Sequence, residues 1–265
     1  MPSVHLGDNA CLHYEVHGQG PPLVLASGLG GQASFWDTHV AWFANRFMVI
    51  TYDHRGSGQS SRGSAPASIE DMARDVVELL DAEQVARAHF VGHSMGGAIG
   101  QSLALDHSER VDKLVLSGTW ALPDLYMRRL FDMRREIALK AGHDVHGRLS
   151  ALLRVPPPWF LDHPRDPGQQ AIACGEAPEI LLERIDAVLG FDRRAELGSI
   201  AMSVLVLAAR DDIIVPPHVT IELARSIPGA RSVLFSIGGH YFPQTRPRKF
   251  AREVTRFLMS AQSGT

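Results

Sequence analysis

A serine lies between two glycines in Gly92-His93-Ser94-Met95-Gly96, where an apolar stretch runs directly into a helical pattern. Glycines on both sides allow a sharp turn that presents the serine oxygen at a strand-to-helix corner, close to the positive end of the helix. A hydroxyl presented in this way can attack a carbonyl carbon. A bare G-x-S-x-G pattern also occurs by chance, so the prediction depends on this context. We predict Ser94 as a nucleophile, with a purely structural turn as the alternative.

A carboxylate and a histidine later in the chain could activate Ser94. Asp211 and Asp212 follow the apolar stretch 204–208, and His240 follows a second apolar stretch. A serine hydroxyl is a weak nucleophile until a base takes its proton, and an imidazole base needs a carboxylate that fixes its tautomer and stabilises its cation. We therefore predict His240 as the base and one of the two aspartates as its partner. The alternative for His240 is a surface histidine.

These side chains require strands that end close together. Short apolar runs bounded by Gly, Pro or Asp are typical of buried parallel strands, and they occur at residues 23–26, 47–52, 89–91, 114–116, 204–208 and 232–235. Helical patterns lie between several of them, at residues 69–80 and 98–105. Strand and helix in alternation predict the α/β class, a parallel sheet with helices on both faces.

Two further segments complete the predicted architecture. Residues 4–6 and 12–14 flank Gly7-Asp8-Asn9 and predict an antiparallel hairpin at one edge, so the sheet would be mixed. From about residue 120 the strand pattern stops, and charged helical stretches appear. We interpret residues 120–198 as an all-helical cap, inserted into a core formed by residues 1–119 and 199–265. With 265 residues, the chain is expected to form one body.

The composition excludes several functional classes. With 45% hydrophobic and 21% charged residues and a formal net charge of -3, the chain is typical of a soluble globular protein. It has no basic run, so nucleic acid is not an expected partner. Its two cysteines, Cys11 and Cys174, form no C-x-x-C pattern, which favours a reducing compartment. No leader and no apolar stretch of membrane-spanning length is seen, so we expect a cytoplasmic protein without membrane contact.

Neither a metal nor another cofactor is expected. The chain has 13 histidines but no H-E-x-x-H motif, and His143 and His146 are expected in a polar loop of the cap without a carboxylate cluster. The glycine clusters at residues 28–31 and 92–97 do not form G-x-G-x-x-G with a later acidic residue, as a dinucleotide requires.

The motif around Ser94 and the two later residues resemble the α/β-hydrolase superfamily. The order Ser94, Asp212, His240 matches the Ser…Asp…His order of that superfamily. The resemblance implies an α/β-hydrolase fold with an eight-stranded, mostly parallel sheet and an inserted helical cap. The family pattern places the acid four residues before a proline, here Pro216, and this selects Asp212.

Two other aspartates are alternatives for the acid. Asp211 is the less favoured of the adjacent pair, and in this interpretation it is a solvated loop residue. Asp124 follows the stretch 114–116, where some members of the superfamily carry their acid.

The same resemblance implies two donors for an oxyanion. After the first long strand, in Ser27-Gly28-Leu29-Gly30-Gly31, these enzymes supply one backbone N–H, and the residue after the nucleophile supplies the other. By position the donors are Leu29 and Met95. Many members have His-Gly where this chain has Ser27-Gly28. That difference leaves the backbone donor in place, and the Ser27 hydroxyl could touch the substrate.

Across nearly the whole chain, the sequence resembles the aminoacrylate hydrolases of the Rut pyrimidine-degradation pathway. The match extends into the cap, where this superfamily diverges fastest; the matching stretches are residues 27–31, Arg128-Arg129, Arg134-Arg135, 152–159 and 238–240. The 3-oxoadipate enol-lactonases are similar over the core, with a weaker fit in the cap. Both families act on small carboxylate-bearing substrates. Some Rut-pathway relatives lack the serine found here, so esterase or lactonase activity is an alternative.

A small anionic substrate favours a cation in the cap, because a guanidinium can hold a carboxylate at two points. Arg154 is a candidate, as are the arginines of the stretch 127–136. An apolar stripe on that stretch places most of its arginines on the solvated side, namely Arg128, Arg129 and Arg135. Trp120 and Trp159 are expected to line or close the pocket, with a place in the core as the alternative.

All three positions of the predicted triad hold competent residues, which favours an enzyme over a binding module that has the fold without the chemistry. The sequence does not decide between an acyl-enzyme on Ser94 and direct activation of water by His240. The expected partner is a small-molecule substrate. The oligomeric state is left open, with a homodimer as one option.

Overall fold

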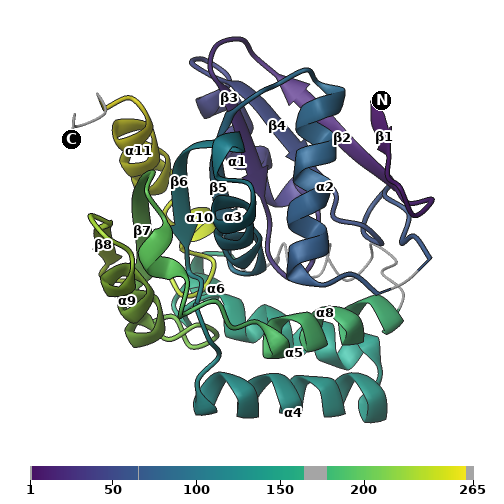
Figure 1. Cartoon of the computed structure of the whole chain (residues 1–265). Helices are drawn as coiled ribbons and strands as arrows, with labels where there is room; N and C mark the ends of the chain where they lie inside the picture. The colour runs from purple at the N-terminus through teal and green to yellow at the C-terminus, as the bar shows by residue number, and fades with distance from the viewer. Residues whose placement is uncertain (1, 65, 164–177, 261–265) are drawn as a thin grey trace.

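The computed structural model describes residues 2–64, 66–163 and 178–260, whose strands form one sheet (Figure 1). Within these residues the sheet has eight strands in the order β1-β2-β4-β3-β5-β6-β7-β8. They are β1 (Ser3–His5), β2 (Cys11–His17), β3 (Pro22–Ala26), β4 (Met48–Tyr52), β5 (Ala88–His93), β6 (Val111–Ser117), β7 (Ser203–Ala209) and β8 (Arg231–Phe235). The β1–β2 and β2–β4 pairs are antiparallel, and the other neighbouring pairs are parallel. The predicted mixed sheet with its N-terminal hairpin is therefore present.

Alternate residues of the central strands point to opposite faces of the sheet, and both faces are buried. Along β3, Val24 and Ala26 belong to one apolar cluster, whereas Leu23 and Leu25 belong to the other. A strand that is buried on both sides is apolar at most of its positions. This is why the central strands are visible in the sequence as short continuous apolar runs.

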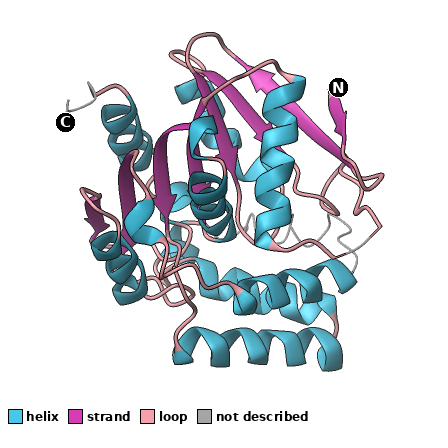
Figure 2. Ribbon diagram, in the orientation of Figure 1, coloured by secondary structure: helices cyan, strands magenta, loops and turns pink. Residues whose placement is uncertain are grey.

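Helices cover both faces of the sheet (Figure 2). One cluster includes residues from α2 (Ile69–Ala82), α3 (Met95–Asp106) and α9 (Pro217–Ser226). The other includes residues from α1 (Asp37–Phe43), α10 (Phe242–Thr245) and α11 (Pro247–Leu258). The helix α2 starts where the sequence provides a cap, because the Ser68 side chain accepts from the N–H of Asp71 and the Asp71 carboxylate accepts from the N–H of Ser68.

The cap helices lie between β6 and β7 in the chain. They are α4 (Leu125–Ala141), α5 (His143–Arg154), α6 (Trp159–Asp162) and α8 (Pro178–Gly190). The helix α4 packs against both α5 and α8, and Figure 1 shows these three together at one end of the sheet. The predicted cap comprises residues 120–198. Its residues 164–177, which include Cys174, lie outside the described residues.

One prediction about the cap is wrong. His143 and His146 were expected in a loop, but they occupy the first turn of α5.

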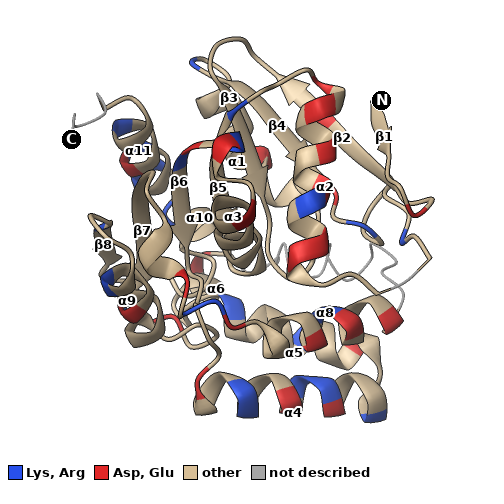
Figure 3. Cartoon of the chain, in the orientation of Figure 1, with Lys and Arg blue, Asp and Glu red and all other residues tan. Residues whose placement is uncertain are grey.

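The surface carries acidic and basic positions interspersed along α2 and α4 (Figure 3). Among the described residues, no helix combines the length and the apolar character that a membrane span requires.

Candidate active site

Ser94 occupies a strained turn between β5 and α3. Its backbone has φ 56° and ψ -120°, a conformation that a residue with a side chain rarely adopts and that costs about 1–3 kcal/mol. The Ser94 N–H donates to the Ser117 carbonyl at 2.8 Å, which fixes the turn to β6. The flanking glycines are required by close contact: a Cβ on Gly92 would lie 2.1 Å from the Gly96 carbonyl oxygen.

Asp212 and His240 form a buried pair at the carboxyl ends of β7 and β8. The His240 Nδ1–H donates to Asp212 Oδ2 at 2.8 Å, and the two residues are 4% and 3% exposed. The other carboxylate oxygen, Oδ1, accepts from the N–H groups of Ile214 and Val215, each at 2.9 Å. With Nδ1 protonated and held by Asp212, Nε2 of His240 carries the lone pair that a general base needs.

Asp211 is not a simple solvated loop residue, and that expectation is corrected. Its Oδ1 accepts from the N–H groups of Gly238 and Gly239 at 2.9 and 3.0 Å. These glycines immediately precede His240, so Asp211 ties the loop after β7 to the loop that carries the histidine. The two adjacent aspartates therefore hold neighbouring parts of the same loop pair.

Asp124 lies elsewhere, at the start of the cap. Its Oδ1 accepts from the N–H of Met127 at 2.8 Å and caps α4, while its Oδ2 lies 2.7 Å from Nε2 of His218. His240 is already paired with Asp212, so nothing in this geometry favours Asp124 as the acid.

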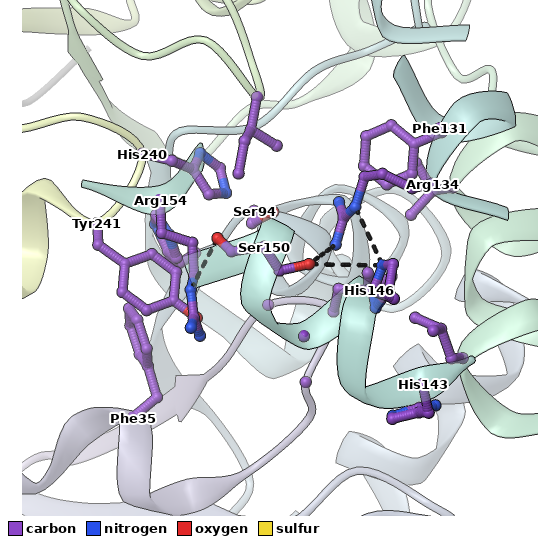
Figure 4. Close-up of a pocket in the computed structure, with 18 residues that line it drawn as sticks. Phe35, Ser94, Phe131, Arg134, His143, His146, Ser150, Arg154, His240 and Tyr241 are labelled. Carbon is purple, nitrogen blue, oxygen red and sulfur yellow. Dashed lines mark hydrogen bonds between the residues drawn. The ribbon is translucent and has the colours of Figure 1, made fainter. Parts of the chain in front are cut away.

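Ser94 and His240 line one cavity with a volume of about 130 Å³, which lies between the sheet and the cap (Figure 4). The loop after β3 contributes Gly28, Leu29 and Gly30 to its wall. The cap contributes a ring of polar and aromatic side chains, namely Phe131, Arg134, His143, His146, Ser150 and Arg154. The cavity therefore combines the candidate catalytic groups of the core with a charged wall from the cap.

The two predicted oxyanion donors are backbone groups on the core side. Leu29 lines the cavity and Met95 is the first residue of α3. Within the described part of the chain, neither N–H donates a hydrogen bond. Two hydrogen bonds hold the loop that carries Leu29. Ser57 Oγ of the core donates to the Gly30 carbonyl at 2.8 Å, and Arg184 Nη1 of the cap donates to the Leu29 carbonyl at 2.7 Å.

His93, the residue before Ser94, lies beside the candidate base without adding a charge. Its ring centroid is 4.8 Å from that of His240, and its ring stacks on Phe35 at 5.0 Å. Burial, followed by the nearby His240, holds the pKa of His93 well below its usual range. A neutral His93 does not repel an imidazolium that forms on His240 during a reaction.

Two arginines of the described part of the cap line the cavity: Arg154, which the sequence analysis named, and Arg134, one of the arginines of the stretch 127–136 that were also candidates. Arg154 lines the cavity, stacks over Tyr241 at 4.9 Å and donates to the Tyr241 hydroxyl at 3.2 Å. Arg134 is 5% exposed and lines the same cavity. The helical spacing contained the signal, because Arg134 follows Phe131 by three residues and Met127 by seven, on the buried stripe of α4.

Three expected substrate contacts are not among the cavity-lining residues. Trp120 is fully buried in the main apolar cluster just after β6, so its place is the core. Trp159 lies in α6, where its ring stacks on His163 at 3.7 Å. Ser27 is 2% exposed and its hydroxyl is enclosed by protein instead of facing the cavity, although Gly28 and Leu29 beside it line the wall.

The described ranges contain no group of three or more His, Cys, Asp or Glu residues that could hold a metal ion. Four histidines line the described cavity wall: His143 and His146 from α5, His93 from the end of β5, and His240 from the loop after β8. Among the described residues, the hydrogen bond between a carboxylate and one of these histidines is the one from His240 to Asp212.

Comparisons with known proteins show the family of the chain. The sequence profile of the alpha/beta hydrolase fold family matches residues 21–247. A protein of Azorhizobium caulinodans that bears the name carbamate hydrolase RutD is 40% identical over 260 residues, covering 97% of this chain and 98% of its own length.

Solved structures of other hydrolases have a similar fold. A hydrolase from Pseudomonas aeruginosa PA01 has a TM-score of 0.89 at 31% identity and covers 98% of each chain. The enol-lactonase from Burkholderia xenovorans LB400 has a TM-score of 0.90 at 28% identity and covers 98% of this chain and 100% of its own. The chain belongs to the alpha/beta hydrolase fold family and is, within it, a hydrolase related to the proteins that bear the name RutD.

Proposed function

We propose that this hydrolase uses a Ser94-His240-Asp212 triad to cleave a small substrate that carries a carboxylate, by a reaction that resembles aminoacrylate hydrolysis. The observation that carries the proposal is the buried Asp212–His240 hydrogen bond in the wall of the cavity to which the strained Ser94 also belongs. A small cavity with cations in its cap wall supports the choice of a small anion.

In the proposed mechanism His240 takes the proton of Ser94 while the serine oxygen attacks the substrate carbonyl. The N–H groups of Leu29 and Met95 stabilise the oxyanion, and His240 then passes the proton to the leaving group. Water, activated by the same histidine, releases the acid and restores Ser94. Asp212 stabilises the imidazolium in both steps.

On an enamine or vinylogous carbamate, His240 would activate water directly, and no bond to Ser94 would form. Relatives support both kinds of substrate, because one bears the name carbamate hydrolase and one is an enol-lactonase. Ester or lactone hydrolysis is therefore the second candidate. The proposed partner is a small molecule in each case.

The test is hydrolysis of p-nitrophenyl acetate together with labelling by a fluorophosphonate serine probe. Ser94→Ala is expected to lose labelling and at least about 10³-fold in kcat, because the nucleophile is removed. Ser102→Ala is the matched control, since Ser102 is a buried serine of the adjoining helix α3 that does not line the cavity. Full turnover by Ser94→Ala would contradict the assignment of Ser94 as the nucleophile. A wild-type protein that shows neither labelling nor turnover would indicate a binding module.

The substrate class is tested by comparing kcat/KM for aminoacrylate, a carbamate, an enol-lactone with a free carboxylate and a neutral ester. We expect a carboxylate-bearing compound to exceed the neutral ester by at least tenfold. If Ser94→Ala retained turnover of aminoacrylate alone, direct activation of water would be the route for that substrate. A neutral ester as the best substrate would contradict the anionic class.

A further inference from the structure

Arg134 is a buried cation in the wall of the catalytic cavity. It comes from α4, is 5% exposed, and lines the same cavity as Ser94 and His240. Figure 4 shows its guanidinium and the His240 ring on different sides of the view, with Ser94 between them. A cationic side chain in this position requires an explanation, because the neighbouring position on α4, Met133, is exposed to solvent and Arg134 is not.

The hydrogen-bond and ring partners of Arg134 among the described residues are all uncharged. Its Nε donates to Nε2 of His146 at 3.3 Å, its Nη2 donates to Ser150 Oγ at 3.2 Å, and it lies over the Phe131 ring at 4.9 Å. Among the described residues, no carboxylate lies within ion-pair distance of it. A buried charge is strongly disfavoured unless an opposite charge compensates it, so this group is incomplete without an anion.

The surroundings keep Arg134 available for an anion. Burial, followed by the charge of Arg154, lowers the pKa of Arg134 to about 10, so the side chain still carries its charge at neutral pH. Burial, followed by Arg134 itself, lowers the pKa of His146 to about 3. A neutral His146 accepts the hydrogen bond from Arg134 Nε and fixes the guanidinium, and it brings no second positive charge.

The second cation of the cavity, Arg154, is engaged differently. Its Nε donates to the Ser150 carbonyl at 3.1 Å, and its guanidinium stacks on Tyr241 and donates to the hydroxyl of that residue. The Arg154 carbonyl in turn accepts from the N–H of Tyr241 at 2.8 Å. These contacts join α5 to the loop that carries His240, and they give Arg154 a role in holding the wall.

We propose that Arg134 is the carboxylate-binding residue of this cavity, held in place by His146 and Ser150, and that it selects small monocarboxylates by an ion pair at the cap side of the pocket. This inference rests on the proposed function, because it names the group that recognises the anionic substrate. The cavity of about 130 Å³ resembles in size a cavity that holds one small ring, about 150 Å³, so the bound acid has only a few heavy atoms.

The experiment measures binding in the Ser94→Ala protein, where no turnover occurs. Propionate and propionamide are titrated by calorimetry and by the rise in melting temperature, because the two ligands share their shape and differ in charge. We expect propionate to bind at least tenfold more tightly than propionamide. Arg134→Met in this background is expected to remove that preference, by weakening propionate at least tenfold and leaving propionamide unchanged.

Arg129→Met is the matched control, because Arg129 is an exposed arginine of the same helix outside the cavity. It is expected to leave both affinities unchanged. If Arg134→Met does not fold, Arg134→Lys decides, since a point charge cannot grip a carboxylate with two parallel hydrogen bonds: propionate binding that is several-fold weaker supports the proposal, and unchanged binding overturns it.

Two other results overturn the inference: no charge preference in the parent protein, or a preference that survives Arg134→Met. In the second case, loss of the preference in Arg154→Met would assign the carboxylate to Arg154 instead. Binding by the Ser94→Ala protein is independent of the nucleophile. Loss of the carboxylate site and loss of the proposed triad are therefore separate outcomes.

Discussion

Asp211 and Asp212 are neighbours in the chain with different partners. Asp212 holds His240 Nδ1, and Asp211 holds the two backbone N–H groups just before that histidine. Side chains of adjacent residues after a strand leave the backbone in different directions, so two carboxylates in series can serve two loops. One contact fixes the orientation of the His240 ring, and the other fixes the backbone that leads into His240.

Asp212→Ala and Asp211→Ala should therefore affect different measurements. Asp212→Ala is expected to lower kcat for p-nitrophenyl acetate by about 10³- to 10⁴-fold, because the imidazolium loses its counter-charge. Asp211→Ala leaves two backbone donors without their acceptor, so we expect a lower melting temperature and a smaller loss in kcat. Equal losses in kcat at equal melting temperatures would contradict this division.

The sequence predicted the residues whose pattern is local or ordered along the chain. Ser94 and His240 were predicted from a strand-to-helix motif and the order of residues along the chain, and Asp212 from the superfamily pattern that places the acid four residues before a proline. The geometry places Asp212 against His240 and brings Ser94 and His240 to one cavity. The role of Asp211 depends on which way two adjacent side chains point. No periodicity encodes that direction, so the sequence alone did not reveal it.

At the scale of elements, a side chain of the cap helix α8 contacts the loop after β3, which carries Leu29, the proposed oxyanion donor. Arg184 is 1% exposed; its Nη1 donates to the Leu29 carbonyl, and its Nη2 donates to Ser57 Oγ at 2.7 Å. Ser57 Oγ donates onward to the Gly30 carbonyl. The carbonyls of this loop are therefore fixed from the cap, which sets the direction of the Leu29 N–H one peptide away.

Arg184→Met is expected to lower kcat for p-nitrophenyl acetate by about 10- to 100-fold with a small change in KM, because a misdirected oxyanion donor acts mainly in the transition state. Arg184→Lys should recover part of the loss, since an ammonium can reach one of the carbonyls. Asp186→Asn serves as a control on the exposed side of α8, where Asp186 pairs with Arg135. An effect on KM alone would show that Arg184 acts on binding.

The elements themselves were predicted more completely in the core than in the cap. Buried strands and the helices 69–80 and 98–105 have strong apolar patterns, and α2 and α3 include those residues. In the cap, His143 and His146 looked like loop residues because the stretch is polar. They form a helix turn whose polar side faces a cavity, and a cavity does not select for apolar residues as a core does.

At the scale of the whole molecule, several histidines are buried as neutral groups. His39, His54 and His93 are each 1% exposed and His146 is 5% exposed. Burial is the largest cause in each case, and it lowers the pKa of His39 to about 4 and the pKa values of His54 and His146 to about 3. The unfolded chain has no such burial, so its histidines titrate near 6.5.

The free energy of unfolding is therefore expected to decrease as the pH is lowered from about 6.5 to about 4. Below 6.5 the unfolded state binds protons that the folded state excludes, and each such histidine contributes up to about 1.4 kcal/mol per pH unit. Urea unfolding at pH 7.5, 6.5 and 5.5 and constant ionic strength measures the effect. A free energy of unfolding that stays constant from pH 7.5 to 5.5 would contradict the buried neutral state of these side chains.

The anchoring of Arg184 also bears on how such an enzyme can change during evolution or in the laboratory. Arg184, which holds the loop of the proposed donor Leu29, lies on α8. The proposed selectivity groups, Arg134, His146 and Ser150, lie on α4 and α5. Substitutions at these three positions are therefore expected to alter which substrate binds without moving the loop that carries Leu29, whereas Arg154 of α5 also holds the loop of His240. Libraries randomised at Arg134, His146 and Ser150, with Arg154 and Arg184 retained, would test whether substrate choice can change separately from the reaction.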